Sequence, residues 1–297
     1  MITSVDMYLD QLKKNLAGCD VATIQDAMTD AEEYLRNGLE ALRVENSEMI
    51  EADALGKIID EFGAPEEFAA DYKKLEARLH PVIKPAVTQK GETNIFYRIF
   101  GIFADPLAWS SLVFMLVSMV TGILYFTWAV TGLSLSVGLL VLIISLPFIG
   151  LFFLSVRGVA LIEGRIVEAL LGVRMPRRPI FVDGNLGWWA RFKVLFNSRH
   201  TWLTIFYMIL MLPLGVIYFS IFITLISLSL GFILAPLAQL FLPFPMITVG
   251  NSMYYVTPDL GIMVFLLGII FSIGTMNLAK VLGRWHGTLA KAMLVGE

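Results

Sequence analysis

Residues 106–156 read PLAWSSLVFMLVSMVTGILYFTWAVTGLSLSVGLLVLIISLPFIGLFFLSV, a stretch of 51 residues without Asp, Glu, Lys or Arg. Residues 200–258 form a second stretch without these residue types. A hydrocarbon layer ~30 Å thick is crossed by a helix of about 20 apolar residues. The first stretch therefore predicts a hairpin of two spans, with Thr131 and Gly132 as its tight turn. We expect four spans in all, at about 107–130, 133–156, 201–222 and 259–279.

The composition separates the chain into two parts. A mean hydropathy of +0.74 and a hydrophobic content of 57% lie outside the range of soluble globular proteins. Residues 1–94 carry ten Lys/Arg and nineteen Asp/Glu, a net charge of −9. Residues 95–297 carry twelve and six, a net charge of +6. We therefore predict an acidic soluble module joined to a membrane domain with a basic rim.

Residues 1–79 are predicted to form four short helices, because apolar residues recur there at helical spacing. Gly63 is expected to end the third helix and Pro65 to begin the fourth. A module of this size buries only a small core, which favours a docking domain over a catalytic one. Residues 80–94 contain three Pro or Gly and are predicted to be a linker.

An acidic run lies in the second predicted helix, at Asp26, Asp30, Glu32 and Glu33. Hard cations prefer oxygen ligands that converge from a loop. We therefore interpret this run as a solvated helix face and not as a cation site.

Basic residues flank the predicted spans on one side only. The connection between the second and third spans holds eight Lys/Arg and the C-terminal tail three, whereas the other two connections hold none. Cytoplasmic segments carry such an excess. We therefore place the N-terminus, residues 157–199 and the C-terminus in the cytoplasm, in a multi-pass protein of the cell (inner) membrane. The N-terminus shows no basic segment followed by an apolar one, so no cleavable signal peptide is expected.

The two predicted hairpins resemble each other in sequence. A shift of 93 residues aligns the pairs Trp109/Trp202, Gly122/Gly215, Tyr125/Tyr218, Ser136/Ser229 and Gly138/Gly231. Beyond the second span the shift becomes 119, which indicates an insertion of about 26 residues near 232–258. Because each unit holds two spans, we expect an internal repeat of two hairpins in the same, parallel orientation.

Each unit also ends in a basic amphipathic stretch. In residues 158–172, Ile162 belongs to the apolar stripe, whereas Glu163 is predicted to face away from it. Such helices lie in the membrane interface with their basic residues toward lipid phosphates. The lipid-headgroup candidates are Arg165, Arg174, Arg177, Arg178, Arg191, Lys193 and Arg284. The mixture of aromatic and basic residues at 188–193 is interpreted in the same way, so no nucleic-acid partner is expected.

The inserted residues 232–258 form an unusually apolar exterior connection. Two interpretations stay open. The segment is either a lipid-covered cap without a ligand or a recognition site for an apolar signal such as a lipid, peptide or antibiotic. The outer ligand candidates are Gln239, Asn251, Tyr254 and Tyr255.

The residue patterns of common enzymes are missing from the sequence. It has no phosphate-binding Gly-rich loop, no zinc-ligating histidine pair and no Ser-His-Asp set. The single Cys19 excludes an intramolecular disulfide and a cysteine-based metal cluster. His200 and His286 lie at cytoplasmic span ends, where we expect them to reach toward the interface. We therefore expect no catalytic residue, no metal and no cofactor, and the lack of a mid-membrane acidic residue disfavours a coupled transporter.

Two stretches carry a resemblance to known families. Residues 62–69, FGAPEEFA, follow acidic helices and resemble the N-terminal HAAS-type signalling domain of prokaryotes. A second set resembles the four-span "putative sensor" domain: Gly164-Arg165, Leu170-Leu171-Gly172-Val173, Pro176, Gly187-Trp188 and Trp202. The resemblance implies a membrane sensor or signalling adaptor. It supplies no catalytic residues, and without a kinase domain the output must come from a partner.

These observations predict an all-α protein, with a small cytoplasmic helical domain and a four-helix transmembrane domain in residues 95–297. We expect a non-enzymatic sensor or adaptor that passes a membrane or outer-leaflet signal to a cytoplasmic signalling or regulatory protein, with membrane lipids as further partners. A lipid-binding, membrane-organising protein or, with less support, a small-molecule exporter are the alternatives, and a homo-oligomer stays open. The opposite charges of the two parts also predict that the acidic module docks on the basic rim.

Overall fold

The computed structural model describes residues 2–45, 50–78, 100–139, 145–177, 193, 196–241, 245, 247–254 and 257–295. The N-terminal module consists of α1 (Val5–Asn15), α2 (Val21–Glu45), α3 (Glu51–Phe62) and α4 (Pro65–Arg78). In the described residues, the membrane domain contains the short η1 (Gly101–Ala104) and four long helices, α6 (Pro106–Gly138), α7 (Ser145–Leu171), α9 (Arg199–Phe241) and α10 (Pro258–Leu294). The predicted all-α class is confirmed, with one small addition, the hairpin of β1 (Ile247–Val249) and β2 (Ser252–Tyr254).

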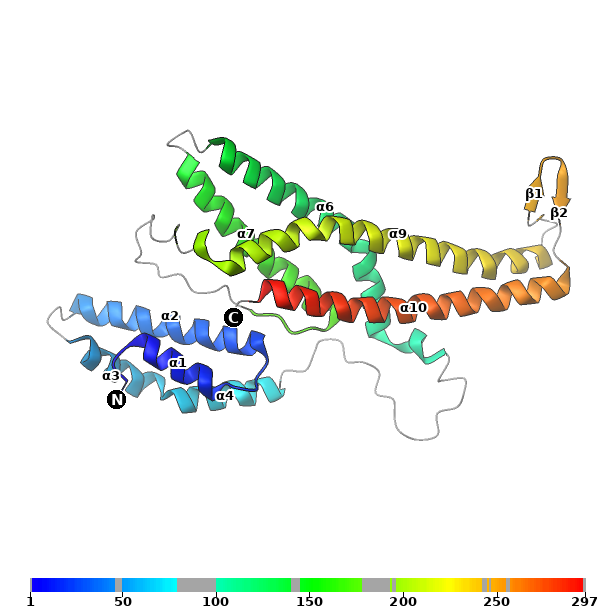
Figure 1. The fold of residues 1–297 in the computed structure, drawn as a ribbon. Coiled ribbons are helices and arrows are strands. Elements are labelled where there is room, and N and C mark those ends of the chain that lie inside the picture. The colour runs from blue at the N-terminus through cyan, green and yellow to red at the C-terminus, as the bar shows by residue number, and fades with distance from the viewer. Residues whose placement is uncertain are drawn as a thin grey trace.

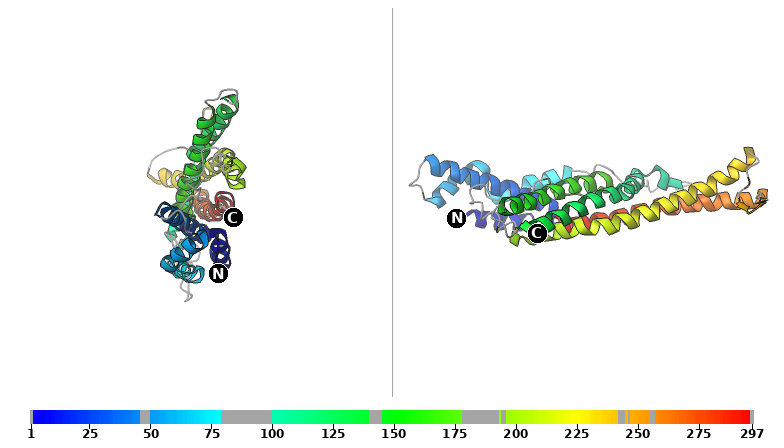
Figure 2. Two further views of the ribbon diagram at one scale, coloured as in Figure 1. Left: turned by 90° about the vertical axis from the view of Figure 1, so that its left-hand side faces the viewer. Right: turned by 90° about the horizontal axis from the view of Figure 1, so that it is seen from above.

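The N-terminal module packs its four helices around a small apolar core. Tyr8, Leu12, Leu35 and Leu55 are fully buried in it. Gly63 ends α3 with a φ of +104° and donates its N–H to the carbonyl of Ile59, as a glycine C-cap does. The module lies at one end of the elongated molecule (Figures 1 and 2).

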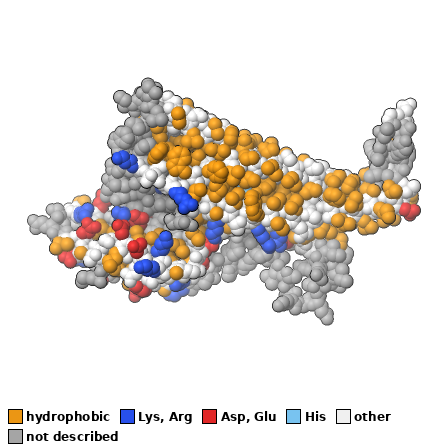
Figure 3. Space-filling model, viewed as in Figure 1, with side chains coloured by type: hydrophobic (Ala, Val, Ile, Leu, Met, Phe, Trp, Pro, Cys, Tyr) orange, Lys and Arg blue, Asp and Glu red, His pale blue; other side chains and the backbone are white. Residues whose placement is uncertain are grey.

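Four helices of the described part are long and apolar enough to cross a membrane. Figure 3 shows a continuous apolar surface over this part of the molecule, with charged side chains gathered on the N-terminal module. Val120, Leu124 and Ile270 are more than 40% exposed, although water would disfavour such exposure. A lipid solvent accounts for this surface, so the chain is a multi-pass membrane protein.

The first hairpin turns later than the sequence predicts. Helix α6 continues through Thr131 and Gly132 and ends at Gly138. Gly132 is buried, and a Cβ atom there would lie 2.0 Å from the ring of Phe152 on α7. The predicted turn at 131–132 is therefore wrong, because this glycine permits close helix packing and does not break the helix.

Residues 158–171 were predicted to form an amphipathic helix that lies in the membrane interface. In the structure they instead continue the long helix α7 without interruption. Ile162, predicted for the apolar stripe, is 60% exposed, whereas Glu163 is 1% exposed. The amphipathic pattern had assigned the wrong face, because the buried face of this helix is partly polar.

Helices α6 and α9 approach each other closely at two glycines. A Cβ atom on Gly122 would lie 2.5 Å from the carbonyl oxygen of Met211, and one on Gly215 would lie 2.4 Å from that of Ser118. Small residues permit such backbone contact between membrane helices. As α6 advances from 118 to 122, its partner on α9 moves back from 215 to 211. The two helices therefore run in opposite directions at this contact.

The end of the α6–α7 hairpin consequently points away from the end of the α9–α10 hairpin (Figure 1). This differs from the parallel orientation expected of the two units. That expectation came from counting two spans in each unit, and the count says nothing about how the hairpins pack. A contact between small residues accommodates helices running in either direction.

Candidate functional site

A buried polar cluster in the membrane domain joins all four long helices. We call it the Glu163 cluster. It consists of Tyr125 on α6, Glu163 on α7, Tyr207 and Tyr218 on α9, and His286 on α10. Each of these side chains is at least 91% buried, and Glu163, Tyr207 and His286 are almost completely so.

Glu163 lies at one side of the cluster and accepts two hydrogen bonds. The hydroxyl of Tyr125 donates to Oε2 over 2.9 Å, and the hydroxyl of Tyr207 donates to Oε1 over 2.7 Å. A buried carboxylate is costly unless its oxygens are hydrogen-bonded. The two tyrosines therefore allow an acidic side chain inside the apolar domain.

His286 lies at the other side and meets tyrosine hydroxyls with both ring nitrogens. Nε2 is 3.0 Å from the hydroxyl of Tyr207, and Nδ1 is 3.3 Å from that of Tyr218. The ring of Phe114 packs against the imidazole, with 4.8 Å between centroids. Tyr207 thus connects Glu163 to His286.

The single hydroxyl proton of Tyr207 restricts how the cluster holds its protons. When this proton is donated to Glu163, Nε2 of His286 must carry its own proton and donate to the Tyr207 oxygen. Nδ1 then either accepts from Tyr218 or, in an imidazolium, donates to it. The cluster can therefore take up one proton by reversing a single hydrogen bond, without moving a helix.

The sequence prediction for this site was wrong in two respects. His286 is completely buried and does not reach toward the interface. Glu163 lies within an apolar helix that is long enough to span a membrane, so the acidic residue expected to be absent from the membrane interior is present at a polar core. Tyr125 and Tyr218, matched at the 93-residue shift, were the signal that could have located it.

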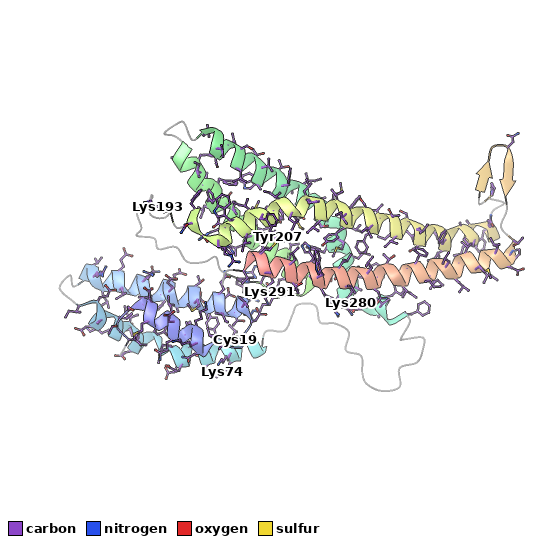
Figure 4. The ribbon with its side chains drawn as sticks, viewed as in Figure 1. Cys19, Lys74, Lys193, Tyr207, Lys280 and Lys291 are labelled. Carbon is purple, nitrogen blue, oxygen red and sulfur yellow. The ribbon has the colours of Figure 1, made fainter. Side chains whose placement is uncertain are left out.

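The N-terminal module contacts the membrane domain next to the end of α10. Lys291 forms an ion pair with Asp20 over 2.5 Å, and the backbone N–H of Arg177 donates to Asp26 over 2.6 Å. In Figure 4 the Lys291 side chain lies at the end of α10 that faces the module. Asp26 is 6% exposed, so interpreting its whole acidic run as a solvated face was wrong.

A small cavity of about 20 Å³ lies at the same junction, between Gln25 of the module and His200 of α9. Nε2 of His200 donates to the carbonyl of Leu294 over 2.8 Å, while its Nδ1 has no hydrogen-bond partner among the described residues. The space suffices for one water molecule. A water there would satisfy this nitrogen at the contact between module and membrane domain.

The predicted lipid-headgroup residues come from several segments of the chain, and their role in binding lipid stays a prediction. Arg165 and Arg284 are exposed on different helices, and Lys193 is also exposed. Arg174 and Arg177 belong to the segment after α7, where Arg177 contacts the module. Arg178 and Arg191 lie outside the described residues.

The outer ligand candidates are spread over the inserted segment. Gln239 lies near the end of α9 and is partly buried, Asn251 is exposed in the turn of the β-hairpin, and Tyr254 ends β2. Tyr255 is outside the described residues. Their role in binding an outer ligand stays a prediction. Within the described ranges, no group of three His, Cys, Asp or Glu side chains could hold a metal ion.

The membrane domain matches a known protein family. A family model described as "Putative sensor" matches residues 114–294. The chain belongs to this family. No curated protein and no solved structure matches the chain. The matched residues of the sensor domain include all five members of the Glu163 cluster, whereas the N-terminal module lies outside them.

Proposed function

We propose that this protein is a non-enzymatic membrane sensor or signalling adaptor, in which the packing of the four long helices controls the docking of the N-terminal module. The supporting observation is the position of two residues on α10. His286 belongs to the Glu163 cluster and Lys291 holds Asp20 of the module. Five residues separate them, which is about 7.5 Å along a helix. A shift or rotation of α10 that disturbs one contact therefore disturbs the other.

The polar cluster is suited to such a role because its hydrogen bonds are directional. Inside a low-dielectric domain a satisfied network fixes one arrangement, and a partly satisfied one is strongly disfavoured. A change in lipid packing, an outer ligand or a proton that alters one helix would therefore favour another arrangement of the whole cluster. We propose that the altered α10 releases the module.

The N-terminal module is proposed to be the HAAS-like output domain that meets a cytoplasmic partner. Its four helices and the glycine cap at Gly63 support this assignment. The opposite charges of module and rim meet in one observed ion pair, Asp20 with Lys291, and Asp26 also accepts a hydrogen bond from the backbone N–H of Arg177. These contacts support a docked state that competes with anionic lipid for the basic rim.

The internal repeat is part of the same proposal. Nε1 of Trp109 donates to the carbonyl of Phe103 over 2.9 Å, and Nε1 of Trp202 donates to that of Phe196 over 2.8 Å. The two tryptophan donors are 93 residues apart, and so are the two phenylalanine acceptors. Gly122 and Gly215, which make the backbone contacts described above, have the same spacing. We infer that the two hairpins descend from one unit and meet through equivalent surfaces.

The experiment measures docking through the rate at which a maleimide modifies Cys19, in the full chain reconstituted in nanodiscs. Lys291→Asp should raise this rate by removing the attraction to Asp20, and the added Asp20→Lys should restore it by reversing the pair. Lys74→Asp changes an exposed charge of the module and is the matched control.

Coupling is then tested by changes inside the membrane domain. Glu163→Gln and Tyr207→Phe should each alter the Cys19 rate, although the hydrogen bonds of both residues described above lie within the membrane domain. If both variants remain folded and label as the wild type does, the cluster does not control docking and the proposed mechanism is wrong.

A further inference from the structure

The N-terminal module contains a groove of about 750 Å³ between α2, α3 and α4. Four aromatic rings follow one another along it. Tyr34 stacks on Phe62 with 4.2 Å between centroids, Phe62 meets Phe68 at 4.6 Å, and Phe68 meets Tyr72 at 5.1 Å. Tyr34 is 44% exposed, so this aromatic surface reaches the solvent.

The charged residues of the groove are mostly acidic. Asp30, Glu33 and Glu61 line it, against the single basic Lys57. The hydroxyl of Tyr72 donates to Asp30, which connects the aromatic floor to the rim. The groove thus combines an apolar floor with a negative edge.

The groove lies farther along α2 than the contact with the membrane domain. Asp20 and Asp26 make that contact near the start of the helix, whereas the groove uses α2 from Asp30 to Leu42. The groove does not include the residues that hold the module in place. A docked module can therefore still present it.

We propose that this groove binds an amphipathic helix of a cytoplasmic partner protein, with apolar residues on the face toward the aromatic floor and Lys or Arg along its edges. Helices bind hydrophobic grooves through apolar residues spaced at i, i+3, i+4 and i+7. The acidic rim selects a basic helix, because charge complementarity governs encounter and disfavours acidic competitors. Aromatic rings suit the floor because aromatic residues often supply much of the binding energy at interfaces. Their faces also attract the cationic groups of Lys and Arg through cation–π interactions.

The inference deepens the proposed function by giving the chemistry of the partner. The test uses the full chain in nanodiscs of zwitterionic lipid, with empty nanodiscs as the background. The probe is a labelled model helix of about five turns, with leucine on one face and lysine on the other. Its counterpart carries glutamate in place of every lysine. A photo-crosslinking side chain at Asn37, a groove residue, reports contact.

The Leu/Lys helix should crosslink at Asn37 and the Leu/Glu helix should not. Glu33→Lys combined with Glu61→Lys should weaken binding of the Leu/Lys helix about tenfold or more. Asp60→Lys lies on α3 beside the groove but does not line it, so this control should bind as the wild type does. Tyr34→Ala should also weaken binding and, because the ring is exposed, should leave the module folded.

Three results would overturn the proposal. These are equal binding of the two helices, equal crosslinking from Glu40 on the outer side of α2, and crosslinks between two copies of the chain in place of the peptide. Failure of the groove can be told apart from failure of the proposed function. Peptide binding requires no response from the Glu163 cluster, and the Cys19 measurement requires no peptide.

Discussion

The hydroxyl of Tyr207 on α9 donates a hydrogen bond to Glu163 on α7 over 2.7 Å, in a domain whose residues 106–156 contain no Asp, Glu, Lys or Arg. This bond joins one helix from each half of the membrane domain. The same hydroxyl lies 3.0 Å from His286 on α10, so one side chain fixes the relative position of three helices.

Tyr207→Phe should destabilise the membrane domain by ~2–3 kcal/mol, because it leaves one oxygen of Glu163 and one nitrogen of His286 without their partner. Thermal unfolding of the reconstituted protein measures the loss. Glu163→Gln should cost less, since an amide oxygen can still accept from a tyrosine. In the double variant the two effects should be clearly non-additive, as for groups of one network. Additive losses would mean that the two side chains act separately.

Replacing either glycine of the α6–α9 contact should force these helices apart. In Gly122→Ala and Gly215→Ala the new Cβ would meet a backbone carbonyl at 2.5 Å and 2.4 Å, and a backbone cannot move aside as a side chain can. Overpacking of this kind costs ~1–3 kcal/mol. The two variants should lower the unfolding temperature by similar amounts, because their contacts are equivalent.

The matched controls for this prediction are Gly138→Ala and Gly231→Ala, which are also 93 residues apart. At neither position does a neighbouring atom of the described residues, apart from the helix's own backbone, lie within 4 Å of the added Cβ. Alanine replaces glycine in a helix with a gain of ~0.5–1 kcal/mol, so these variants should be neutral or slightly more stable. Equal destabilisation by all four substitutions would contradict the close contact.

The sequence predicted correctly that the N-terminal module is helical and that the membrane domain holds four long apolar helices. Gly63 and Pro65 ended and began helices as predicted, and four apolar helices were expected and are present. Burial in lipid leaves few alternatives to a helix, so such elements follow from local residue type. The prediction of a turn at 131–132 was wrong because glycine occurs both in turns and at close helix contacts. Only the position of Phe152 shows that Gly132 belongs to a close contact.

The Glu163 cluster could not be predicted in the same way. Its five members come from four helices, and their approach depends on contacts between distant residues. The stripe that includes Ile162 suggested that Glu163 faces water, since amphipathic analysis assumes one apolar and one solvated face. In lipid the exposed face is the apolar one. The pattern then has the opposite meaning, and the polar residue faces inward.

The N-terminal module should lose stability at alkaline pH through Tyr8. Burial, followed by the charges of Glu66 and Glu67, raises the pKa of Tyr8 to about 12. The neutral phenol, which donates to the carbonyl of Gly63 over 3.0 Å, is the form favoured by folding. Its contribution is complete below pH 10, the ordinary tyrosine pKa, and is lost as the pH rises through about 12.

Near-ultraviolet absorbance of the phenolate checks this prediction. The difference between wild type and Tyr8→Phe should show one tyrosine that ionises near pH 12. Glu66→Gln should lower that pKa, because one of the repelling charges is gone. Tyr8→Phe should also cost ~1 kcal/mol at neutral pH through the lost hydrogen bond. A Tyr8 that ionises near pH 10 in the folded protein would show that the ring is not buried as described.

Labelling from outside the cell tests the sidedness of the two hairpin ends. In a Cys19→Ser background, single cysteines replace Gly138, at the end of α6, or Asn251, in the β-hairpin, both of which are exposed. Neither end carries Lys or Arg, so the basic-residue rule predicts that an impermeant maleimide labels both in intact cells, whereas the opposite directions of the two hairpin ends in the structure predict labelling at only one. Native Cys19 should be labelled only after the membrane is opened. Labelling at Asn251 alone would place the α6–α7 end in the cytoplasm. The opposite directions of α6 and α9 would then hold across the whole membrane, and the two hairpins would be inserted in opposite orientations.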